Sequence, residues 1–514
     1  MTLLNPLDAA WLYVDTHDTP MQVANLQIFS PPPGAPDDYV GRIVAELKAP
    51  RAVVPPFNKK LIGGWLSSLV YAWTETDDID LDYHVRHSAL PRPGGERELG
   101  VLVSRLHGQP LDFSRPLWEC HFIEGLERSR FAIYFKMHHS MIDGVSGMRL
   151  LQRKLTTDPD RRGMPPPWAS EAAAADHVTV DPTEAPALAT VADLLREQAG
   201  SLTDVGMALM ELLRAGLQGG DDALTAPLTC PFSVINGRIT AHRRFATQTL
   251  ELDEVRAVAR RAECTVNDVI LWLCSTALRR FLDELGTLPD DPLTAGLPVN
   301  VRPAGDDATG TAITFICANL ATTVENPRVR LAAIKASTER AKEHLQALPR
   351  AGLTQYTIAV MAPYILQLLT GLGGRLRPVF NITISNVPGP TEPLYLNGAR
   401  LEAMYPMSLL SHGQALNITC LSYNGKLNFG FTGCRDTLPH MQRLAVYAGE
   451  AFAELKQLYA ASPRRSATRS AGSTPRPPRA RTRAAGSTGQ VGAPAPKRAT
   501  AKRTATRPAA RARR

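Results

Sequence analysis

Two adjacent histidines, His138 and His139, are the side chains in this sequence best suited to acid–base chemistry. Their segment reads His-His-Ser-Met-Ile-Asp-Gly, so a carboxylate, Asp143, follows His139 by four residues. A neutral imidazole can take a proton from a hydroxyl group near pH 7 and later return it. We therefore expect a histidine of this pair to act as a general base. The alternative is a pair of solvated loop histidines beside a turn-forming Asp-Gly.

No nucleophile motif accompanies the histidines, because the Gly-x-Ser-x-Gly pattern of serine hydrolases does not occur near them. Direct attack by a base-activated hydroxyl is thus favoured over a covalent acyl-enzyme. Asp143 follows through a turn, and we interpret it as a structural residue rather than as the group that orients the imidazole. It is expected to pin its loop by pairing with an arginine, for which Arg115 and Arg302 are candidates.

A strand-like run precedes the histidines. Large apolar side chains occupy every second position of residues 131–137, and Ala132, Tyr134 and Lys136 lie between them. This period of two predicts a half-buried strand. Gly144 then gives the backbone freedom where the chain turns toward a helix-like segment, residues 145–155. The histidines are thus expected at a strand end.

In the second half of the chain, a helix is predicted at residues 266–282. Thr265 is a good N-cap for it, because its hydroxyl can accept a hydrogen bond from the amide of Asp268. Asn267 and Asp268 then lie in the first turn. They serve there either as capping and dipole-compensating groups or as polar groups that face a substrate channel.

Two runs rich in β-branched residues, 296–302 and 379–387, predict strands that end in polar groups. Ser385 and Asn386 stand at the end of the second run, before a Pro-Gly turn. Small polar groups there could position a thioester or a hydroxyl, and turn chemistry alone is an equal contender. Strands that alternate with helices predict an α/β fold. The remaining elements predicted in this half are a strand at 245–252 and a helix at 252–261.

The chain resembles the bacterial wax ester synthase/diacylglycerol acyltransferase family. This family lies within the superfamily of coenzyme A dependent acyltransferases, which also contains chloramphenicol acetyltransferase and the condensation domains of peptide synthetases. The superfamily resemblance rests on residues 138–144. The narrower resemblance rests on further segments that together span residues 6 to about 440: Pro6–Leu12, Thr19–Val23, Arg115–Trp118, Asn236–Ile239, Arg243–Phe245, Asn267–Val269, Pro298–Arg302 and Ser385–Pro390.

The resemblance implies two chloramphenicol-acetyltransferase-like subdomains with a central channel. It implies transfer of a long-chain acyl group from coenzyme A to a fatty alcohol or diacylglycerol, with no metal and no cofactor other than acyl-CoA as substrate. By residue-by-residue transfer, His139 corresponds to the family's proton acceptor, with His138 and Asp143 in support. The candidates for the substrate channel are Asn267, Asp268, Ser385 and Asn386.

At 514 residues with 44% hydrophobic content, the chain is long enough to bury two cores. We expect an N-terminal acyltransferase half at 1–156, a linker with amphipathic helices at 157–240 and a C-terminal half at 241–460. The start of the linker, 157–186, is rich in proline and charge and predicts an exposed connector. Apolar residues at mixed three and four spacing predict an amphipathic helix, or a pair of helices broken near Gly200, at 188–217.

Seven cysteines without Cys-x-x-Cys spacing predict buried reduced thiols rather than disulfides or zinc ligands. The N-terminus has no signal-peptide pattern, so we expect a cytoplasmic protein. The most apolar run, 356–372, is interrupted by Pro363 and Gln367, which favours a buried or interfacial helix over a membrane span.

The basic charge of the chain belongs to its end. Residues 463–514 contain 15 Lys and Arg and no Asp or Glu, and removing them from the net charge of +8 leaves about −7 for the rest. With hardly any large apolar residue, a tail at 461–514 is expected to be disordered. Such a segment could hold the protein at an anionic membrane or lipid inclusion, bind nucleic acid, or have no partner.

Two other functions stay open on the residues alone. One is a noncatalytic lipid-inclusion coat or nucleic-acid tether built around the basic tail. The other is a related condensing acyltransferase that takes its acyl group from a carrier protein. The spread of the motifs over both halves favours the acyl-CoA dependent O-acyltransferase.

Overall fold

The computed structural model describes the chain from Thr2 to Ala460 with several gaps. The first 460 residues form one unit by their contacts. The residues that lie outside the description are 1, 5, 64–70, 143–146, 148–149, 151–153, 170–224, 226, 301–312, 349 and 461–514.

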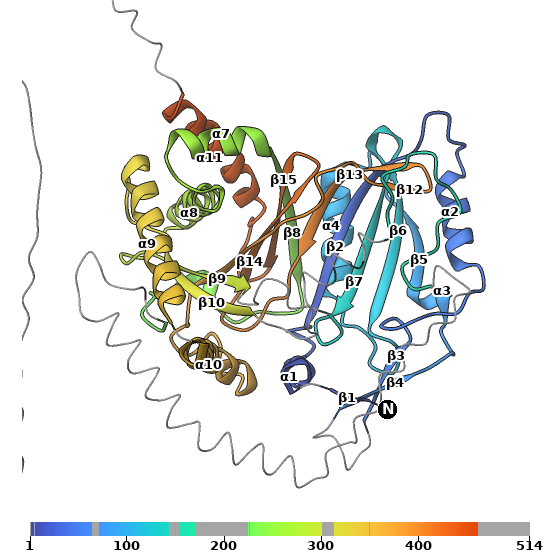
Figure 1. Cartoon of the computed structure of the whole chain (residues 1–514), viewed down its shortest axis with the longest axis horizontal. Helices are drawn as coiled ribbons and strands as arrows, with labels where there is room; N and C mark the ends of the chain where they lie inside the picture. Colours follow the sequence, from blue (N-terminus) through green and yellow to red (C-terminus); the bar gives the residue numbers. More distant parts are fainter. Residues whose placement is uncertain are drawn as a thin grey trace, which may run out of the picture. The chain divides into compact units, whose positions relative to one another are not determined.

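One strand of a six-stranded sheet ends at His138, and Figure 1 labels the strands of this sheet. Its strands, in spatial order, are β12 (Tyr395–Leu396), β13 (Ala399–Met407), β2 (Gln22–Ser30), β7 (Arg130–His138), β6 (Trp118–Leu126) and β5 (Val85–Ala89). Neighbouring strands are antiparallel except β5 and β6, which are parallel. The predicted strand at 131–137 is thereby confirmed as β7, in the interior of the sheet.

The predicted half burial of β7 is wrong, because both of its faces are covered. Every residue from Phe131 to His138 is buried. Phe131 packs into the core around Trp118, while Tyr134 packs on the opposite face with the apolar side of helix α4 (Glu96–Gly108). A strand covered on both faces buries both of its alternating sets, so Lys136 is buried despite its charge.

The second sheet also has six strands, and they come from the C-terminal part of the chain. In spatial order they are β10 (Ile313–Asn319), β9 (Thr294–Asn300), β11 (Ile382–Val387), β14 (Leu416–Tyr423), β15 (Lys426–Cys434) and β8 (Arg243–Glu251). β11 is parallel to β9 and to β14, and the other neighbours are antiparallel. The strands predicted at 245–252, 296–302 and 379–387 are confirmed as β8, β9 and β11, with small shifts at their ends.

Helices gather beside the second sheet, where Figure 1 shows α7, α8, α9 and α11 together. α7 (Leu252–Arg261) has the predicted bounds, and α8 (Val266–Glu284) begins after the predicted cap. The hydroxyl of Thr265 accepts a hydrogen bond from the amide of Asp268 at 3.2 Å. Among the described residues, the other helices of four or more residues are α1 (Pro6–Val14), α2 (Tyr39–Lys48), α3 (Leu81–His84), α9 (Pro327–Ala347), α10 (Arg350–Leu369) and α11 (Arg443–Leu458).

The chain crosses from the second sheet to the first and back. β12 and β13 follow β11 in sequence, yet β13 pairs along the edge of β2, and the chain then returns as β14. The first sheet therefore combines strands from the expected N-terminal half, 1–156, with β12 and β13 from the expected C-terminal half, 241–460. The crossing strand also passes close to β15, since a Cβ atom on Gly430 would lie 1.9 Å from the carbonyl oxygen of Pro406. Glycine permits this approach.

The start of the expected linker also differs from the prediction. Residues 158–163 are exposed as predicted, but Met164 and Trp168 are buried. The indole of Trp168 stacks on that of Trp118 with ring centroids 5.3 Å apart. This part of the connector thus belongs to the core of the first sheet. The predicted helix at 188–217 lies outside the described residues, and so does most of the helix predicted at 145–155.

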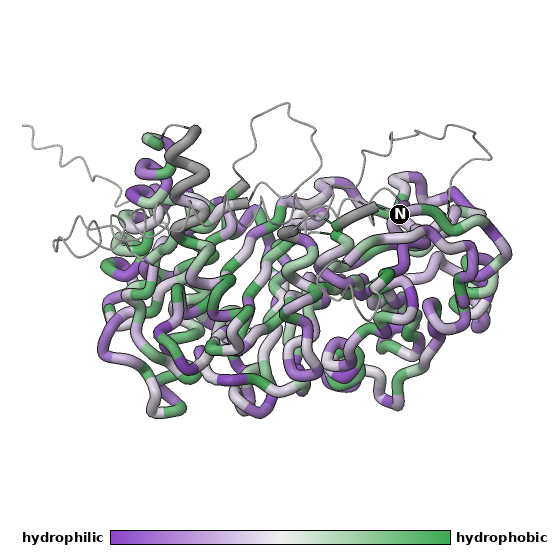
Figure 2. The backbone as a smooth tube through the Cα atoms, turned by 90° about the horizontal axis from the view of Figure 1, so that it is seen from below, coloured by the Kyte–Doolittle hydropathy of each residue, from purple (hydrophilic) through white to green (hydrophobic). Residues whose placement is uncertain are grey.

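Hydrophobic and hydrophilic residues are interspersed along the described backbone (Figure 2). Over that part of the chain, no helix combines the length and the apolar character needed to cross a bilayer. The apolar run predicted as a helix at 356–372 falls largely in α10, which contains Pro363 and exposes Leu366 and Leu369. The seven cysteines are free thiols, six of them buried and Cys264 half-buried.

Candidate active site

The two histidines stand where β7 ends, and their backbones are tied to the segments that precede β6 and β2. The amide of His138 donates to the carbonyl of Leu117 at 3.0 Å, and the amide of His139 donates to the carbonyl of Met21 at 2.8 Å. Two neighbouring strands therefore hold the peptide units of the pair from either side.

His138 is buried, and both of its ring nitrogens have partners. The amide of Ser140 donates to Nδ1 at 3.1 Å, and the hydroxyl of Ser140 lies 2.7 Å from the same nitrogen. Nε2 lies 3.2 Å from Oδ2 of Asp15. Because an amide N–H can only donate, Nδ1 is the acceptor and Nε2 carries the proton that is shared with Asp15. His138 thus has no nitrogen lone pair to offer to a substrate in this arrangement.

His139 has a different environment. Its side chain is half-buried, whereas that of His138 is 1% exposed. The imidazole of His139 lies against the indole of Trp11 in α1, with ring centroids 4.5 Å apart. His139 is thus the more accessible of the two rings, and an aromatic neighbour limits its rotation.

Asp15 and Trp11 contact the two histidines, and neither was among the site residues predicted from the sequence. Oδ2 of Asp15 accepts from His138 and also from the amide of Met21, at 2.6 Å. Asp15 stands 123 positions before His138, so no local spacing connects them. Trp11 lies in the segment Pro6–Leu12, one of those that carry the resemblance to the family. Because this segment contacts the histidine motif, there is a physical reason for its sequence to be characteristic of the family.

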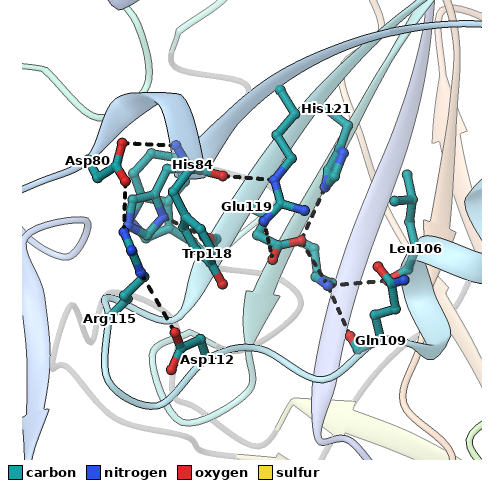
Figure 3. A network of polar contacts seen from close by, with 12 residues as sticks. Asp80, His84, Leu106, Gln109, Asp112, Arg115, Trp118, Glu119 and His121 are labelled. Atoms are coloured by element: carbon teal, nitrogen blue, oxygen red, sulfur yellow. Dashed lines mark hydrogen bonds and ion pairs between the residues drawn. The ribbon is translucent and has the colours of Figure 1, made fainter.

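A buried ionic cluster around Glu119 joins β6 and β7 (Figure 3), and its lysine, Lys136, stands two positions before His138. Nζ of Lys136 lies 3.0 Å from Oε2 of Glu119, its partner in register on β6. Nζ also donates to the carbonyls of Leu106 and Gln109, at 3.2 and 3.1 Å. These three acceptors match the three N–H groups of an ammonium ion, so the buried charge is satisfied.

Glu119 is the centre of this cluster. Its Oε1 lies 3.3 Å from the guanidinium of Arg86, and its Oε2 lies 3.1 Å from Nε2 of His121. Burial raises the pKa of Glu119, but the hydrogen bond from His121 and the charges of Lys136 and Arg86 outweigh it. The net effect lowers the pKa to about 2. Glu119 is therefore a carboxylate at any physiological pH.

The lysine of this cluster also binds the C-terminal end of α4. Gln22, which faces His138 in register, donates from Nε2 to the carbonyls of His107 and Gln109 at 2.6 and 2.9 Å. Lys136 and Gln22 thus bind the same turn from two adjacent strands. Positive groups at a helix C-terminus are favourable because the last carbonyls have no partners within the helix.

The candidates from the second half of the chain have other surroundings. Oδ2 of Asp268 accepts from the amide and hydroxyl of Thr265, at 2.9 and 2.7 Å, and Oδ1 accepts from the hydroxyl of Thr338 at 2.7 Å. Both oxygens of this buried carboxylate are engaged, so the capping interpretation describes Asp268 better than the channel interpretation. Asn267 beside it is half-buried.

Ser385 and Asn386 lie in β11, where Ser385 is half-buried and Asn386 is exposed. The pairing predicted for Asp143 stays a prediction, because Asp143 and Arg302 lie outside the described residues. The other candidate partner, Arg115, pairs with Asp80 at 3.0 Å and with Asp112 at 3.7 Å (Figure 3). Within the described ranges, no group of three or more His, Cys, Asp or Glu side chains is placed to hold a metal ion.

Family models match both parts of the chain. The catalytic domain of wax ester synthase/diacylglycerol acyltransferase matches residues 4–270, and the C-terminal domain of the same enzymes matches residues 309–456. A protein of Mycobacterium tuberculosis named as a diacylglycerol O-acyltransferase is 45% identical over 483 residues, covering 88% of this chain and 96% of the relative. The O-acyltransferase WSD of Acinetobacter baylyi is 38% identical over 451 residues, covering 88% and 96%.

Solved structures agree with these relatives. The wax ester synthase/diacylglycerol acyltransferase of Marinobacter aquaeolei superposes with a TM-score of 0.72 at 38% identity, covering 89% of this chain and all of the other. A condensation domain of the calcium-dependent antibiotic synthetase gives a TM-score of 0.55 at 16% identity, covering 89% and 96%. The second similarity shows that the fold is shared, and it carries no information on substrates.

Proposed function

This chain is a member of the wax ester synthase/diacylglycerol acyltransferase family, and from that premise we propose that it transfers a long-chain acyl group from coenzyme A to the hydroxyl group of diacylglycerol or a fatty alcohol. The products are triacylglycerol or wax ester, and free coenzyme A. The names and coverage of the relatives support the reaction class. Acyl-CoA is a substrate, and the proposal requires no metal.

The difference between the two histidines supports a role for His139 as the general base. His138 is buried with both ring nitrogens engaged, whereas His139 is half-exposed at the strand end. In the proposed reaction, His139 takes the proton of the acceptor hydroxyl while the hydroxyl oxygen attacks the thioester carbon. The carbon–sulfur bond breaks, and the coenzyme A thiolate receives the proton from the imidazolium. This route forms no acyl-enzyme.

An assay with palmitoyl-CoA tests the reaction and the base together. Purified protein is supplied with hexadecanol or with dioleoylglycerol, without any carrier protein, and both the ester product and the released thiol are measured. Absence of ester with both acceptors would contradict the proposed function. If ester forms with acyl-CoA as the only acyl donor, the protein is neither a condensing enzyme that depends on a carrier protein nor a noncatalytic coat.

The variant His139→Ala should lose a factor of about 100 to 10,000 in kcat, the contribution expected of a general base. Circular dichroism and the melting temperature should stay close to those of the parent, because a half-buried side chain at a strand end contributes little to the core. If His139→Ala retains more than a tenth of the parent's turnover, His139 is not the base. His138→Ala should lose less activity and more stability, because His138 is buried and hydrogen-bonded on both sides.

We further propose that the protein works at the surface of an anionic membrane or lipid inclusion, where water-insoluble acceptors reside. The support is the basic composition of residues 463–514. Each basic residue near an anionic surface contributes about 1 kcal/mol of attraction. Nucleic acid would attract the same charge, so a binding test must compare the two.

A further inference from the structure

We propose that Asp15 is a positioning residue that holds both histidines of the site through one carboxylate oxygen. Oδ2 of Asp15 lies 3.2 Å from Nε2 of His138 and accepts the amide of Met21 at 2.6 Å. The carbonyl of Met21 in turn accepts the amide of His139 at 2.8 Å. The inference rests on the proposed role of His139, and it adds a residue from outside the histidine motif.

The first link acts on the ring of His138. Its Nδ1 accepts from the amide of Ser140, so the proton lies on Nε2, and Asp15 is the acceptor that this proton reaches. A flip of the ring by 180° would put carbon atoms in the positions of both nitrogens and break both contacts. Asp15 and Ser140 together therefore select one tautomer and one orientation of His138.

The second link acts on the backbone of His139. The amide of Met21 donates to the carboxylate of Asp15, and the carbonyl of Met21, on the other side of the same Cα atom, accepts the amide of His139. Asp15 thus restrains the residue whose carbonyl holds the backbone of His139, without touching the ring of His139.

The surroundings of Asp15 make these hydrogen bonds strong. Its side chain is 10% exposed and that of His138 is 1% exposed, so water competes little for either partner. Hydrogen bonds to an ionised acceptor are about twice as strong as neutral ones. Removal of the carboxylate would leave buried N–H donors on His138 and Met21 without their acceptor, and burial makes that loss costly.

The connection between α1 and β2 has a shape that brings Asp15 to both partners. The hydroxyl of Thr19 donates to the carbonyl of Val14 at 3.1 Å, and its backbone amide donates to the carbonyl of Thr16 at 3.1 Å. These bonds close a turn between Asp15 and Met21, so a carboxylate at the start of the turn can reach the amide at its end. The backbone of this turn thus supports the role of Asp15 in addition to the contacts of its side chain.

The test compares Asp15→Ala and Asp15→Glu with Asp18→Asn as the matched control. Asp18 lies in the same connection, its side chain is 51% exposed, and its loss removes the same charge. Asp15→Ala should lower kcat by about 10- to 100-fold, the usual effect of losing an orienting partner, with the KM for palmitoyl-CoA within about twofold of the parent's. Asp15→Glu should recover part of the loss, and Asp18→Asn should match the parent. Rates are taken well below the melting temperature and per folded enzyme.

A double-mutant cycle with His138→Gln tests whether Asp15 acts through His138. The loss in Asp15→Ala/His138→Gln should be clearly smaller than the product of the two single losses, because the second change removes a contact that is already broken. Nitrogen-15 NMR of the imidazoles adds a readout that needs no activity: the parent should show His138 as the Nε2–H tautomer, and Asp15→Ala should show a mixture.

Unchanged kcat in Asp15→Ala, a multiplicative cycle, or an unchanged tautomer would overturn the inference. A fall in melting temperature with kcat per folded enzyme intact would reduce Asp15 to a purely structural residue and would overturn it as well. Failure of the parent to acylate either acceptor is a different result. It would contradict the proposed function, while the NMR comparison would still report on the Asp15–His138 contact.

Discussion

The indole of Trp11 lies against the imidazole of His139, with ring centroids 4.5 Å apart and the two planes tilted by 41°. When His139 holds a proton, this aromatic face borders a cation. Such contacts contribute about 0.5 to 2 kcal/mol, depending on how far water is excluded. The helix α1 thus serves both histidines, through Trp11 for one ring and through Asp15, just after its end, for the other.

Replacement of the indole should slow the reaction. Trp11→Leu removes the aromatic face that stabilises the imidazolium, so kcat should fall by about 2- to 30-fold, and Trp11→Phe should fall less. The matched control is Tyr13→Leu on the same helix, whose ring packs on Tyr71. Steady-state kinetics of the three variants decide the point, and equal kcat in Trp11→Leu and the parent would exclude a contribution from the indole.

The buried carboxylate Glu119 should make the stability depend on pH in acid. Its pKa is about 2 in the folded protein, below the ordinary value of 4.5, so the unfolded chain binds the proton more readily between these values. Stability from this group is therefore fully present above about pH 4.5 and is lost as pH falls toward 2. The shift corresponds to a loss on the order of 3 kcal/mol.

Urea unfolding at pH 7 and pH 3.5 measures this effect as a difference between variants. Glu119→Gln should be less stable than the parent at pH 7, because Lys136 loses its buried partner, and its stability should fall less on acidification. Glu325→Gln is the control, since the same change is made on a side chain that is 87% exposed. The expectation fails if parent and Glu119→Gln lose the same free energy between the two pH values.

Trp168 should behave as a core residue although it lies in a segment that reads as a connector. It is 1% exposed and stacks on Trp118. Trp168→Ala should cost about 3 to 5 kcal/mol of unfolding free energy, the usual cost of removing a large buried aromatic ring. Arg161→Ala, in the exposed part of the same segment, should cost almost nothing. Urea midpoints give both numbers, and a loss below about 1 kcal/mol for Trp168→Ala would contradict the packing.

Removal of residues 463–514 should separate catalysis from location. The truncated protein should keep its rate on detergent-dispersed substrates, because the tail has too few large apolar residues to take part in a core. Cosedimentation with anionic vesicles should weaken, and high salt should weaken the binding of the full chain in the same way. Parallel runs with DNA show which polyanion the tail prefers. Equal vesicle binding by both forms would eliminate the tail as a membrane anchor.

Local patterns in the sequence predicted local structure well. α7 begins and ends at the expected residues because a strand, an acidic first turn and a basic last turn mark both of its ends. The cap at Thr265 was predictable for the same reason, since its partner is three residues away. The fold class and the enzyme family were also predictable, because the histidine motif and the segments around it are specific.

Contacts between distant residues were not predictable in this way. Lys136 stands at an alternating position that suggested a solvent-facing side, and its burial depends on partners from elsewhere in the chain, Glu119 on the neighbouring strand and two carbonyls at the end of α4. Asp15 meets His138 across 123 positions, with no spacing rule to connect them. β13 joins the first sheet because the edge of β2 is available for pairing. The periodicity of residues along a single strand does not reveal which strand edges are available.

The crossing of β13 also imposes an order on biosynthesis. The edge of β2 pairs with residues as late as Met407, so the first sheet cannot be completed until most of the chain has left the ribosome. At about 5 to 20 residues per second, that interval is on the order of 20 to 75 seconds. An open strand edge is a template for pairing with other chains. We therefore expect nascent molecules of this protein to need protection from aggregation while the edge of β2 is unpaired. A gene fragment that ends before β13 should yield aggregates rather than an independently folded first half.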